Sequence, residues 1–383
     1  MFKPIFFVRK NIKARFFALL QQDESRFSQL STSLTHFLPE SGKLALESCR
    51  QTVSQAFGES NNPSNYYDPF ECGVILGSGW AGQDAVNDLV SQFNHTGITN
   101  PKSNLINMTG SMTAACAMMY GLKGYQNTIM AACATGTMAI GDAYEVIRAG
   151  RAKCMLAGGT ESLRSEFSIW SIDVPNALSR ETVDPKKASC PFSMDRSGFV
   201  LAEGSAVVCL EDCDSAIARG ASILAEVKSY AQFGDGMNII RPDENVASLS
   251  RTIQIAIDLS GCAASEIDYI NAHGTSTQLN DLYETRAIKK VLGNQAYDVP
   301  VSSTKSYTGH LVGAAGSFET IVCVKALNEG LLPATLNLEL PDPECDLNYL
   351  PNEHHYDASV RLALNISSGF GGQNAALVIA KAE

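Results

Sequence analysis

The sequence predicts an α/β protein in which buried strands alternate with helices. Short apolar runs alternate along the chain with longer segments whose apolar residues repeat at helical spacing. Clusters of glycine or serine follow several of the apolar runs, and loops at strand ends are where α/β proteins usually carry their chemistry. We therefore expect the functional side chains in such loops.

The individual elements follow from these two patterns. Glycine clusters follow the apolar runs at 72–76, 154–157, 267–270 and 362–364, so each of these runs is expected to end in a turn. In chain order, the predicted strands are 72–76, 127–130, 154–157, 206–209, 267–270, 299–302, 362–364 and 375–379. The predicted helices include 137–150, 245–260, 280–292 and 314–328.

The chain has 383 residues and no Gly/Ser-rich or Pro-rich linker, which indicates one large body or two fused halves. The segment that follows Gly158-Gly159-Thr160-Glu161 and runs to about Arg196 has weak periodicity and many polar residues. It predicts a long excursion over the surface, of the kind that often serves as a lid or faces a partner.

The composition excludes several classes of function. A net charge of −11 argues against a nucleic-acid partner, because a phosphate backbone must be met by a basic surface. No stretch reaches the ~18 apolar residues needed to span a bilayer. The eleven cysteines lie in apolar contexts without CxxC pairs, which favours a reducing, cytoplasmic location and packing over a zinc site or a disulfide framework.

The first residues form a basic and aromatic cluster. Lys3, Arg9, Lys10, Lys13 and Arg15 precede every acidic residue and are interleaved with phenylalanines. We interpret this segment as a docked helix with a solvated basic face. An organelle-targeting helix and a docking patch for an acidic partner stay open as alternatives.

Cys133 is the candidate nucleophile. It lies in the run Met130-Ala-Ala-Cys133-Ala-Thr-Gly136, where a strand-like stretch breaks at small residues and a helix begins directly behind the cysteine. A helix N-terminus carries unpaired N–H groups and about half a positive charge, so it favours thiolate over thiol. The placement therefore predicts a lowered pKa for the Cys133 thiol and a reactive sulfur.

Two histidines occur in loops of a similar kind, in Asn271-Ala-His273-Gly-Thr-Ser-Thr277 and in Lys305-Ser-Tyr-Thr-Gly-His310-Leu-Val-Gly. A thiolate can hold an acyl group as a thioester, and two imidazoles can stabilise an enolate through hydrogen bonds at neutral pH. One cysteine and two loop histidines predict covalent acyl chemistry at a site built between two halves of the chain.

Together with Gly369-Phe370-Gly-Gly-Gln-Asn374, these motifs resemble the β-ketoacyl-[acyl carrier protein] synthases of the elongating class I/II branch. The resemblance covers about residues 45–383, with every motif in the family's order. It implies the thiolase fold, with two similar halves in a five-layered αβαβα arrangement. The implied organisation is a divergent leader over 1–44, a first half over 45–215 with the nucleophile and a second half over 216–383 with both histidines.

The same resemblance implies a decarboxylative Claisen condensation of malonyl-acyl carrier protein with an acyl group held on Cys133, elongating a fatty-acyl or polyketide-type chain. His273 and His310 would be the pair at which the malonyl group decarboxylates, with Lys305 and Glu319 as supporting charged groups. No bound cofactor or metal is implied, because substrates arrive on the phosphopantetheine of the carrier protein. The enzyme would work as a dimer whose partner closes the acyl pocket.

Further residues match family positions around this centre. The backbone amides of Cys133 and Phe370 would bind the oxyanion, and Phe370 would also be an aromatic gate. The remaining matches are Thr275 and Thr277 for the pantetheine arm, Phe192 and Leu105 for the acyl pocket, and Arg196 for carrier docking.

Simpler interpretations of these residues stay open. Thr275 and Thr277 could cap the following helix, Phe370 could be a core phenylalanine, and Arg196 could form a surface salt bridge. Glu319 could be an ordinary carboxylate on a helix face. Asp281 and Glu284 lie in the first turn of the predicted helix, where acids are favoured by the helix dipole, and we assign them structural roles.

The sequence also departs from the family pattern. The usual opening strand and glycine turn are replaced by a short leader, so the first strand is expected to be replaced or lost. Ser368 stands where a phenylalanine is usual beside the gate, and Gln278 stands where a proline is usual after His-Gly-Thr-Ser-Thr. These changes are typical of a specialised paralogue.

Two rival functions remain open at this point. A chain-length-factor-like partner subunit of a heterodimeric ketosynthase would share the fold, but such subunits generally lose the cysteine or the histidines. A thiolase or an acyl-CoA starter synthase would use a second cysteine or a Cys-His-Asn set, and the two-histidine pattern argues against both.

Overall fold

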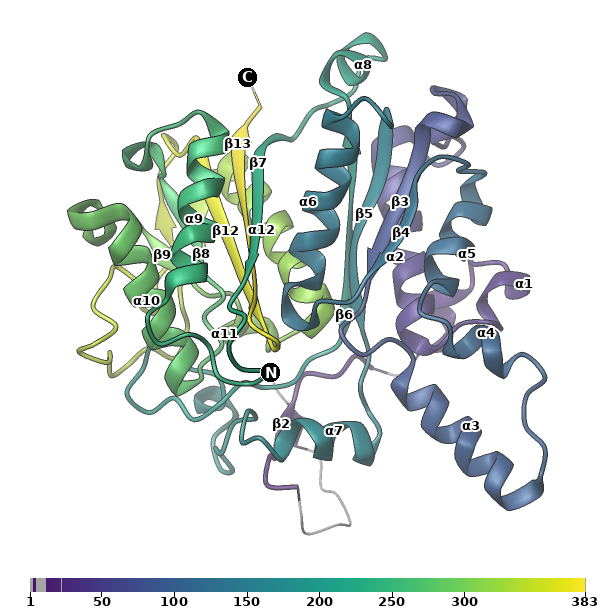
Figure 1. Cartoon of the computed structure of the whole chain (residues 1–383), viewed down its shortest axis with the longest axis horizontal. Coiled ribbons are helices and arrows are strands. Elements are labelled where there is room, and N and C mark those ends of the chain that lie inside the picture. Colours follow the sequence, from purple (N-terminus) through teal and green to yellow (C-terminus); the bar gives the residue numbers. More distant parts are fainter. Residues whose placement is uncertain (1–2, 5–11, 22, 383) are drawn as a thin grey trace.

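The chain folds into five layers, three of helices and two of strands (Figure 1). The structure is a computed structural model that describes residues 3–4, 12–21 and 23–382. Helices α2 (Glu40–Phe57) and α5 (Ser111–Tyr120) cover one sheet, and α9 (Ala247–Ser260) and α10 (Gln278–Leu292) lie on the outer side of the other. Helices α6 (Thr135–Arg148) and α12 (Ala315–Glu329) pack between the sheets. The predicted αβαβα arrangement is confirmed.

The first sheet has the strand order β4 (Gln126–Ile129), β3 (Cys72–Gly77), β5 (Cys154–Glu161) and β6 (Gly204–Glu211). Strand β3 runs parallel to β4 and β5, and β6 runs antiparallel to β5. Every residue of β3 and β5 is buried, because helices cover both faces of the sheet.

The second sheet repeats this topology and adds one strand. Its order is β9 (Val301–Ser302), β8 (Tyr269–Asn271), β12 (Leu362–Gly369), β13 (Gln373–Lys381) and β7 (Ala225–Gly234). Strand β8 is parallel to β9 and β12, and β13 is antiparallel to β12, as in the first sheet. Strand β5 therefore corresponds to β12, and β6 corresponds to β13.

Strand β7 pairs with the free edge of β13, but among the described residues no strand pairs with the equivalent edge of β6. Two hydroxyl groups of α2 bind there instead. Ser48 Oγ donates to the carbonyl of Ser205 at 3.2 Å, and Thr52 Oγ1 donates to the carbonyl of Val207 at 2.8 Å. In the described residues, side chains of a helix thus bind the edge carbonyls of β6.

Shorter elements complete the fold. The remaining helices and strands are α1 (Thr32–Thr35), α3 (Gln83–Thr96), α4 (Ser103–Asn107), α7 (Glu166–Asp173), α8 (Cys213–Ala218), α11 (Lys305–Thr308), β1 (Lys3–Pro4), β2 (Phe16–Phe17), β10 (Leu331–Leu332) and β11 (His355–Tyr356). Turns of 3-10 helix are η1 (Glu24–Phe27), η2 (Pro63–Asn65), η3 (Pro69–Glu71), η4 (Ala132–Ala134), η5 (Pro185–Lys187), η6 (Ala264–Glu266), η7 (Gly293–Tyr297) and η8 (Val312–Ala314).

Besides strand β7, which the sequence patterns did not predict, the structure differs from the sequence prediction in two segments. The prediction of a basic helix near the N-terminus is wrong for residues 12–17, which form no helix. The side chains of Ile12, Phe16 and Phe17 are buried there. Arg9 and Lys10 lie outside the described residues. The surface excursion expected after Thr160 is also wrong in its second part. That part contributes buried side chains to the second half, including Cys190, Phe192, Ser193 and Arg196.

Two general features bear on the class of protein. In the part of the chain that the structure describes, no helix combines the length and the apolar character required to cross a bilayer. All eleven cysteines are within the described residues and none forms a disulfide; the sulfur atoms of Cys154 and Cys209 lie 3.7 Å apart and share a hydrogen bond.

Candidate active site

Cys133 occupies a strained turn at the N-terminus of the central helix α6. The chain leaves β4, passes through η4 (Ala132–Ala134) and enters α6 at Thr135. Ala132 has a φ of +45°, in the left-handed region that L residues seldom adopt. Thr135 stabilises this turn, because its Oγ1 donates to the carbonyl of Ala132 at 2.7 Å and accepts from the amide of Ala131 at 2.9 Å.

The second half contains a matching turn directly after His310. Val312 has a φ of +49°, η8 (Val312–Ala314) follows, and α12 begins at Ala315. Gly313 therefore holds the position that Cys133 holds in the first half. The two turns lie at the N-termini of the paired central helices, and a Cβ added to Gly136 would lie 2.6 Å from the amide of Ser317.

The structure brings the three predicted reactive side chains together. One ligand atom from each of Cys133, His273 and His310 lies within 4.8 Å of the other two, and all three residues are buried. The rings of His273 and His310 meet edge to face, with centroids 5.3 Å apart. Cys133 comes from the first half of the chain, and His273 and His310 come from the second half.

Hydrogen bonding determines what the His310 ring offers. The amide of Val312 donates to Nδ1 of His310 at 3.2 Å, so a neutral ring carries its proton on Nε2. That Nε2 is buried and has no hydrogen-bond partner among the described residues. Burial and the charge of Lys305 hold the pKa of both histidines well below the ordinary value, and His310 adds to this effect on His273.

Neutral rings with this hydrogen bonding suit a substrate oxygen better than a metal ion. A metal would need an unprotonated Nε2 on His310, whereas the amide of Val312 keeps the proton on that atom. We therefore interpret the Nε2–H of His310 as a hydrogen-bond donor that lies close to the Cys133 sulfur, the candidate nucleophile.

Lys305 and Glu319 form an ion pair buried on both sides. Lys305 lies at the start of α11 and is 1% exposed, and its Nζ donates to Oε1 of Glu319 in α12. Burial raises the pKa of Glu319 to about 7, although the charge of Lys305 opposes that rise. Neither a solvated surface amine nor an ordinary helix-face carboxylate describes these residues.

The predicted lowering of the Cys133 pKa is wrong in direction. Burial raises the pKa of the thiol to about 12, against the opposing effects of the Lys305 charge and the Phe370 backbone N–H. The end of α6 makes a local contribution, whereas the whole fold removes water from the sulfur. The raised pKa favours the thiol over the thiolate at neutral pH.

Phe370 lies beside the cysteine in a glycine loop. Its side chain packs in the apolar cluster that contains Cys133, and its backbone N–H is directed at the sulfur. A Cβ on Gly369 would lie 2.7 Å from the carbonyl of Ala131, so only glycine allows this close approach. Gly371 and Gly372 both have positive φ angles, of +86° and +71°.

The departure at Ser368 gives this loop a polar connection. Ser368 Oγ donates to Oδ1 of Asn374 at 2.9 Å, and Nδ2 of Asn374 donates to Oδ1 of Asp235 at 2.8 Å. The amide of Gly371 also donates to the carbonyl of Ile239 at 2.8 Å. The loop that carries Phe370 is thus bound to the segment that follows β7.

Two buried acids of α10 hold the loop of His273. Glu284 accepts hydrogen bonds from the amides of His273 at 2.6 Å and Gly274 at 2.8 Å. Asp281 accepts from the amide of Ser276 at 3.1 Å. Burial raises the pKa of Glu284 to about 7. The hydroxyls of Thr275 and Thr277 lie 2.9 Å apart, and Thr277 caps α10 without a side-chain hydrogen bond.

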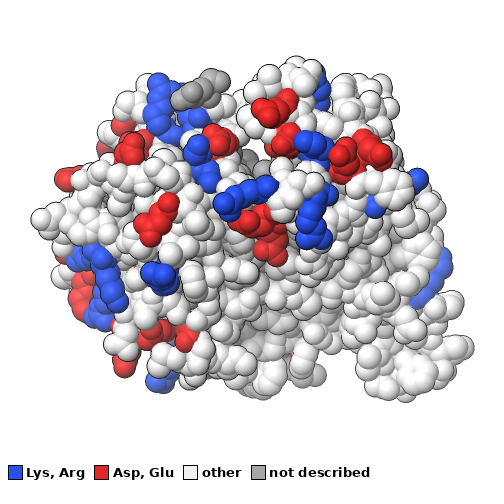
Figure 2. Space-filling view, turned by 45° about the horizontal axis from the view of Figure 1, so that its top comes forward, with Lys and Arg blue, Asp and Glu red and all other residues white. Residues whose placement is uncertain are grey.

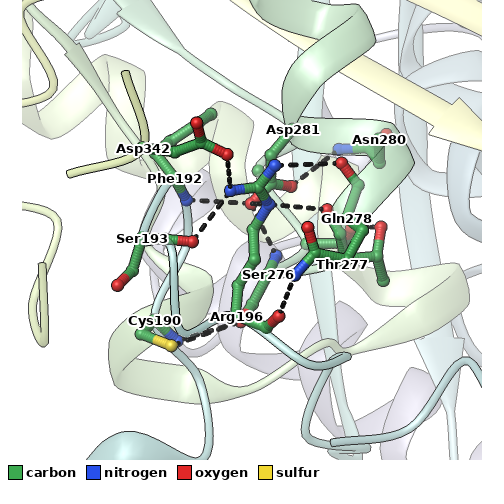
Figure 3. Close-up of polar contacts among 12 residues, drawn as sticks. Cys190, Phe192, Ser193, Arg196, Ser276, Thr277, Gln278, Asn280, Asp281 and Asp342 are labelled. Atoms are coloured by element: carbon green, nitrogen blue, oxygen red, sulfur yellow. Dashed lines mark hydrogen bonds and ion pairs between the residues drawn. The ribbon is translucent and has the colours of Figure 1, made fainter. Parts of the chain in front are cut away.

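Arg196 is buried, which contradicts its predicted role in carrier docking. Figure 3 shows the polar contacts of its side chain, which is 1% exposed, pairs with Asp342 at 2.6 Å and lies 3.8 Å from Asp281. It also donates to the carbonyls of Ser193, Thr277 and Gln278 at 2.8, 3.2 and 3.0 Å. Gln278, where a proline is usual, donates from its side chain to the carbonyl of Arg196. A buried group whose three nitrogens all bind interior acceptors is not placed to contact a carrier protein.

The two residues matched to the acyl pocket lie elsewhere in the single chain. Phe192 is fully buried in the core of the second half, and its ring stacks on Tyr349 with centroids 3.7 Å apart. Leu105, in α4, is 42% exposed. Neither belongs to the apolar cluster around Cys133.

Glu161, at the end of β5, is a buried residue of this region that sequence reasoning missed. Its carboxylate accepts hydrogen bonds from Ser78 Oγ and from the amides of Gly79, Trp80 and Gly313. The available signal was an acid placed just after Gly158-Gly159, at the end of a fully buried strand.

A two-half α/β fold with a cysteine and two histidines at the junction defines a thiolase-like condensing enzyme. The chain belongs to the β-ketoacyl synthase family and is an acyltransferase of that family. Residues 9–216 match the family's N-terminal domain and residues 224–339 match its C-terminal domain.

Named relatives and solved structures agree with this assignment. The 3-oxoacyl-[acyl-carrier-protein] synthase 2 of Synechocystis is 42% identical over 85% of this chain and 79% of the relative. A putative polyketide beta-ketoacyl synthase of Streptomyces halstedii is 38% identical over 85% of this chain and 79% of the relative. A β-ketoacyl synthase structure from Burkholderia phymatum has a TM-score of 0.89 at 28% identity, covering 97% of this chain and 89% of that one. The condensing activity expected from the motifs is confirmed at the level of the family.

Proposed function

We propose that this chain elongates a carrier-bound acyl chain by decarboxylative condensation, with Cys133 as the acyl-accepting nucleophile. The observation that carries the proposal is the approach of the Cys133 sulfur and the two imidazoles to within 4.8 Å of one another. A chain-length-factor-like subunit has no need of this arrangement, because it carries no acyl group of its own.

In the first step the Cys133 sulfur attacks the carbonyl carbon of an acyl thioester. The new C–S bond forms as the pantetheine sulfur leaves, and the proton of Cys133 passes to that leaving sulfur. The backbone amides of Cys133 and Phe370 are proposed to bind the oxyanion of the tetrahedral intermediate. Loss of one such donor typically costs ~2.7–4 kcal/mol.

In the second step the bond between the malonyl carbon and its free carboxylate breaks, releasing CO₂ and leaving an enolate. The unpartnered Nε2–H of His310 suits the enolate oxygen, and His273 lies beside it as a second neutral ring. The enolate carbon then attacks the Cys133 thioester, the C–S bond breaks, and the thiolate takes a proton from water. The charge of Lys305 supports the neutral state of the histidines, and Glu319 holds Lys305 through the buried ion pair.

The carrier and its pantetheine arm are the proposed substrate vehicle. The Synechocystis relative is named as a synthase of acyl-carrier-protein substrates, and a type II polyketide ketosynthase was solved with its acyl-carrier protein and the hexaketide. That structure covers 100% of this chain with a TM-score of 0.87 at 30% identity. Thr275 and Thr277 are the proposed contacts to the arm, with no cofactor required.

A second subunit is proposed to pack on the first half. Strand β4 is the outer strand of its sheet, and Met118 and Met130 beside it are 71% and 55% exposed. Figure 2 shows almost no Lys, Arg, Asp or Glu across its middle and lower right, the side of the first half. An exposed, charge-poor surface beside an open strand suits a homodimer or a heterodimer with a ketosynthase-like subunit. Leu105, exposed in α4, would reach the acyl pocket only through such pairing.

We propose a cytoplasmic location and retain the division into 1–44, 45–215 and 216–383. Eleven free cysteines suit a reducing compartment. The proposed boundary at 215/216 falls within α8, shortly before the chain passes from the first sheet to β7.

Intact-mass measurement after incubation with acyl-carrier protein tests the catalytic proposal. The wild type should gain the acyl mass on Cys133. Cys133→Ala should lose acyl loading and condensation but still decarboxylate malonyl-carrier protein, whereas His310→Ala should lose decarboxylation. An unmodified Cys133 beside a different acylated residue would overturn the assignment.

A further inference from the structure

Glu161, at the end of β5, connects this strand to two other segments near Cys133 and His310. Its Oε1 accepts from Ser78 Oγ at 2.9 Å, and its Oε2 accepts from the amides of Gly79 at 2.7 Å, Trp80 at 3.3 Å and Gly313 at 3.4 Å. Glu161 itself is fully buried. One carboxylate thus binds the loop after β3 and the turn after His310 at the same time.

The turn that receives this contact is strained. Val312 is β-branched and has a φ of +49°, a conformation that surrounding contacts must enforce. The amide of Val312 donates to Nδ1 of His310, and the next amide, that of Gly313, donates to Glu161. The hydrogen bond that determines the His310 tautomer is therefore adjacent to the one that Glu161 makes.

The packing at this point leaves little room for adjustment. A Cβ on Gly313 would lie 2.6 Å from the amide of Gly79, and a Cβ on Gly159 would lie 2.0 Å from the carbonyl of Gly313. The backbone of Gly313 in the second half thus packs directly against the backbone of Gly79 and Gly159 in the first half. Two hydrogen bonds join these surfaces: the amide of Gly313 donates to the Glu161 carboxylate at 3.4 Å, and the amide of Gly159 donates to Ser317 Oγ at 3.1 Å.

The repeat of the two halves shows why the contact matters. Cys133 and Gly313 hold matching positions, and the strands β5 and β12 that end beside these turns also match. Beside Cys133, strand β12 leads into the loop whose Phe370 N–H faces the sulfur. Beside Gly313, strand β5 ends in Glu161, whose carboxylate accepts the amide of that turn.

We propose that Glu161 is a positioning residue that holds the Val312–Gly313 turn and thereby directs the Nε2–H of His310 toward Cys133. The proposal rests on the proposed function, since it concerns the step in which His310 meets the malonyl group. It assigns the effect to hydrogen-bond geometry and not to the charge of Glu161. Burial raises the pKa of Glu161 to about 7, which agrees with a group that works without full ionisation.

Two conservative variants separate geometry from charge. Glu161→Gln removes the charge but keeps the reach, with its oxygen able to accept the three amides and its NH₂ able to donate to Ser78 Oγ. Glu161→Asp keeps the charge but is one methylene too short. Ser162→Ala is the matched control, because Ser162 Oγ donates to Glu203 and not to either loop.

The readouts are decarboxylation of malonyl-carrier protein, acyl loading of Cys133 by intact mass, and the thermal melting midpoint. Glu161→Asp should decarboxylate about 100-fold more slowly than the wild type, the order expected for a misplacement of about 1 Å. Its acyl loading should fall much less. Glu161→Gln and Ser162→Ala should stay near wild type in both reactions.

The outcomes are distinguishable from a failure of the function itself. Decarboxylation by Glu161→Asp equal to or faster than by Glu161→Gln would overturn the positioning role in favour of charge or of no role. An equal fall of loading and decarboxylation in Glu161→Asp would also overturn it, because a general loss of structure would then explain both. A wild type that neither loads nor decarboxylates would instead refute the proposed function.

Discussion

Lys305 and Glu319 form an ion pair with both partners buried, and the charge of Lys305 acts on every group of the reactive centre. It opposes the rise in the pKa of Cys133 and of Glu319, and it lowers the pKa of His273 and His310. The net effect is to favour neutral imidazoles at neutral pH. Burial acts in the same direction on both histidines, so the two causes can be separated only by removing Lys305.

Lys305→Met should move the acid limb of malonyl decarboxylation to higher pH. The wild-type histidines have pKa values well below 6.5, so decarboxylation is lost only when the pH falls through those low values. Without the lysine charge one cause of the lowering is gone, and the histidines protonate at a higher pH. The pH profile of CO₂ release measures the shift.

The control is Lys305→Met combined with Glu319→Gln, which leaves no buried charge unpaired. Breaking one side of a buried pair typically costs about 3–5 kcal/mol, so the single variant should also be less stable than the double variant. Superimposable acid limbs in wild type and both variants would contradict the role of Lys305.

Alkylation of Cys133 by iodoacetamide should accelerate across the whole accessible pH range. Burial raises the pKa of this thiol to about 12, and below the pKa the thiolate fraction rises about tenfold for each pH unit. The rate should therefore still climb between about pH 7 and 9. Peptide mass spectrometry follows the modified site, and Cys213→Ser removes the exposed thiol as background. An alkylation rate that reaches a plateau below about pH 8 would mean that the helix N-terminus affects the pKa of Cys133 more than burial does.

Arg196→Lys should weaken the fold without changing how carrier binding responds to salt. Lysine keeps the charge but cannot reach Asp342 and the three carbonyls that the guanidinium binds together. Leaving buried acceptors unpaired costs about 1–3 kcal/mol in the free energy of unfolding. Denaturant unfolding and carrier titrations at two ionic strengths measure both effects. A changed salt dependence with unchanged stability would restore the docking role.

The reactive residues could be predicted because their signals are local. Cys133 and His273 each lie just after an apolar run, and His310 lies in a motif that the chain alone shows, Lys305-Ser-Tyr-Thr-Gly-His310. Arg196 carries no such signal, because three of its four hydrogen-bond partners lie 81, 82 and 146 residues away along the chain and only Ser193 is near. Its burial becomes visible only when three segments meet.

The sequence patterns did not predict strand β7 and predicted the wrong direction for the pKa of Cys133, for a related reason. The run Ala225–Gly234 mixes charged and polar residues with apolar ones, since it is an edge strand and is only partly buried. The sequence shows the helix that follows Cys133 but not the surrounding layers that remove its water. Local pattern predicts which groups react, while their ionisation depends on the whole fold.

Thr52→Val should destabilise the protein by about 1 kcal/mol, the typical contribution of one hydrogen bond. Thr52 Oγ1 donates to the carbonyl of Val207 at 2.8 Å, on the edge of β6 that no strand of the described residues covers. Valine has the shape of threonine but cannot donate, so the carbonyl loses its partner. Thr52→Ser keeps the hydroxyl and should unfold close to wild type. Urea unfolding compares the three, and equal stability of the valine and serine variants would show that water replaces the helix hydroxyl at this edge without cost.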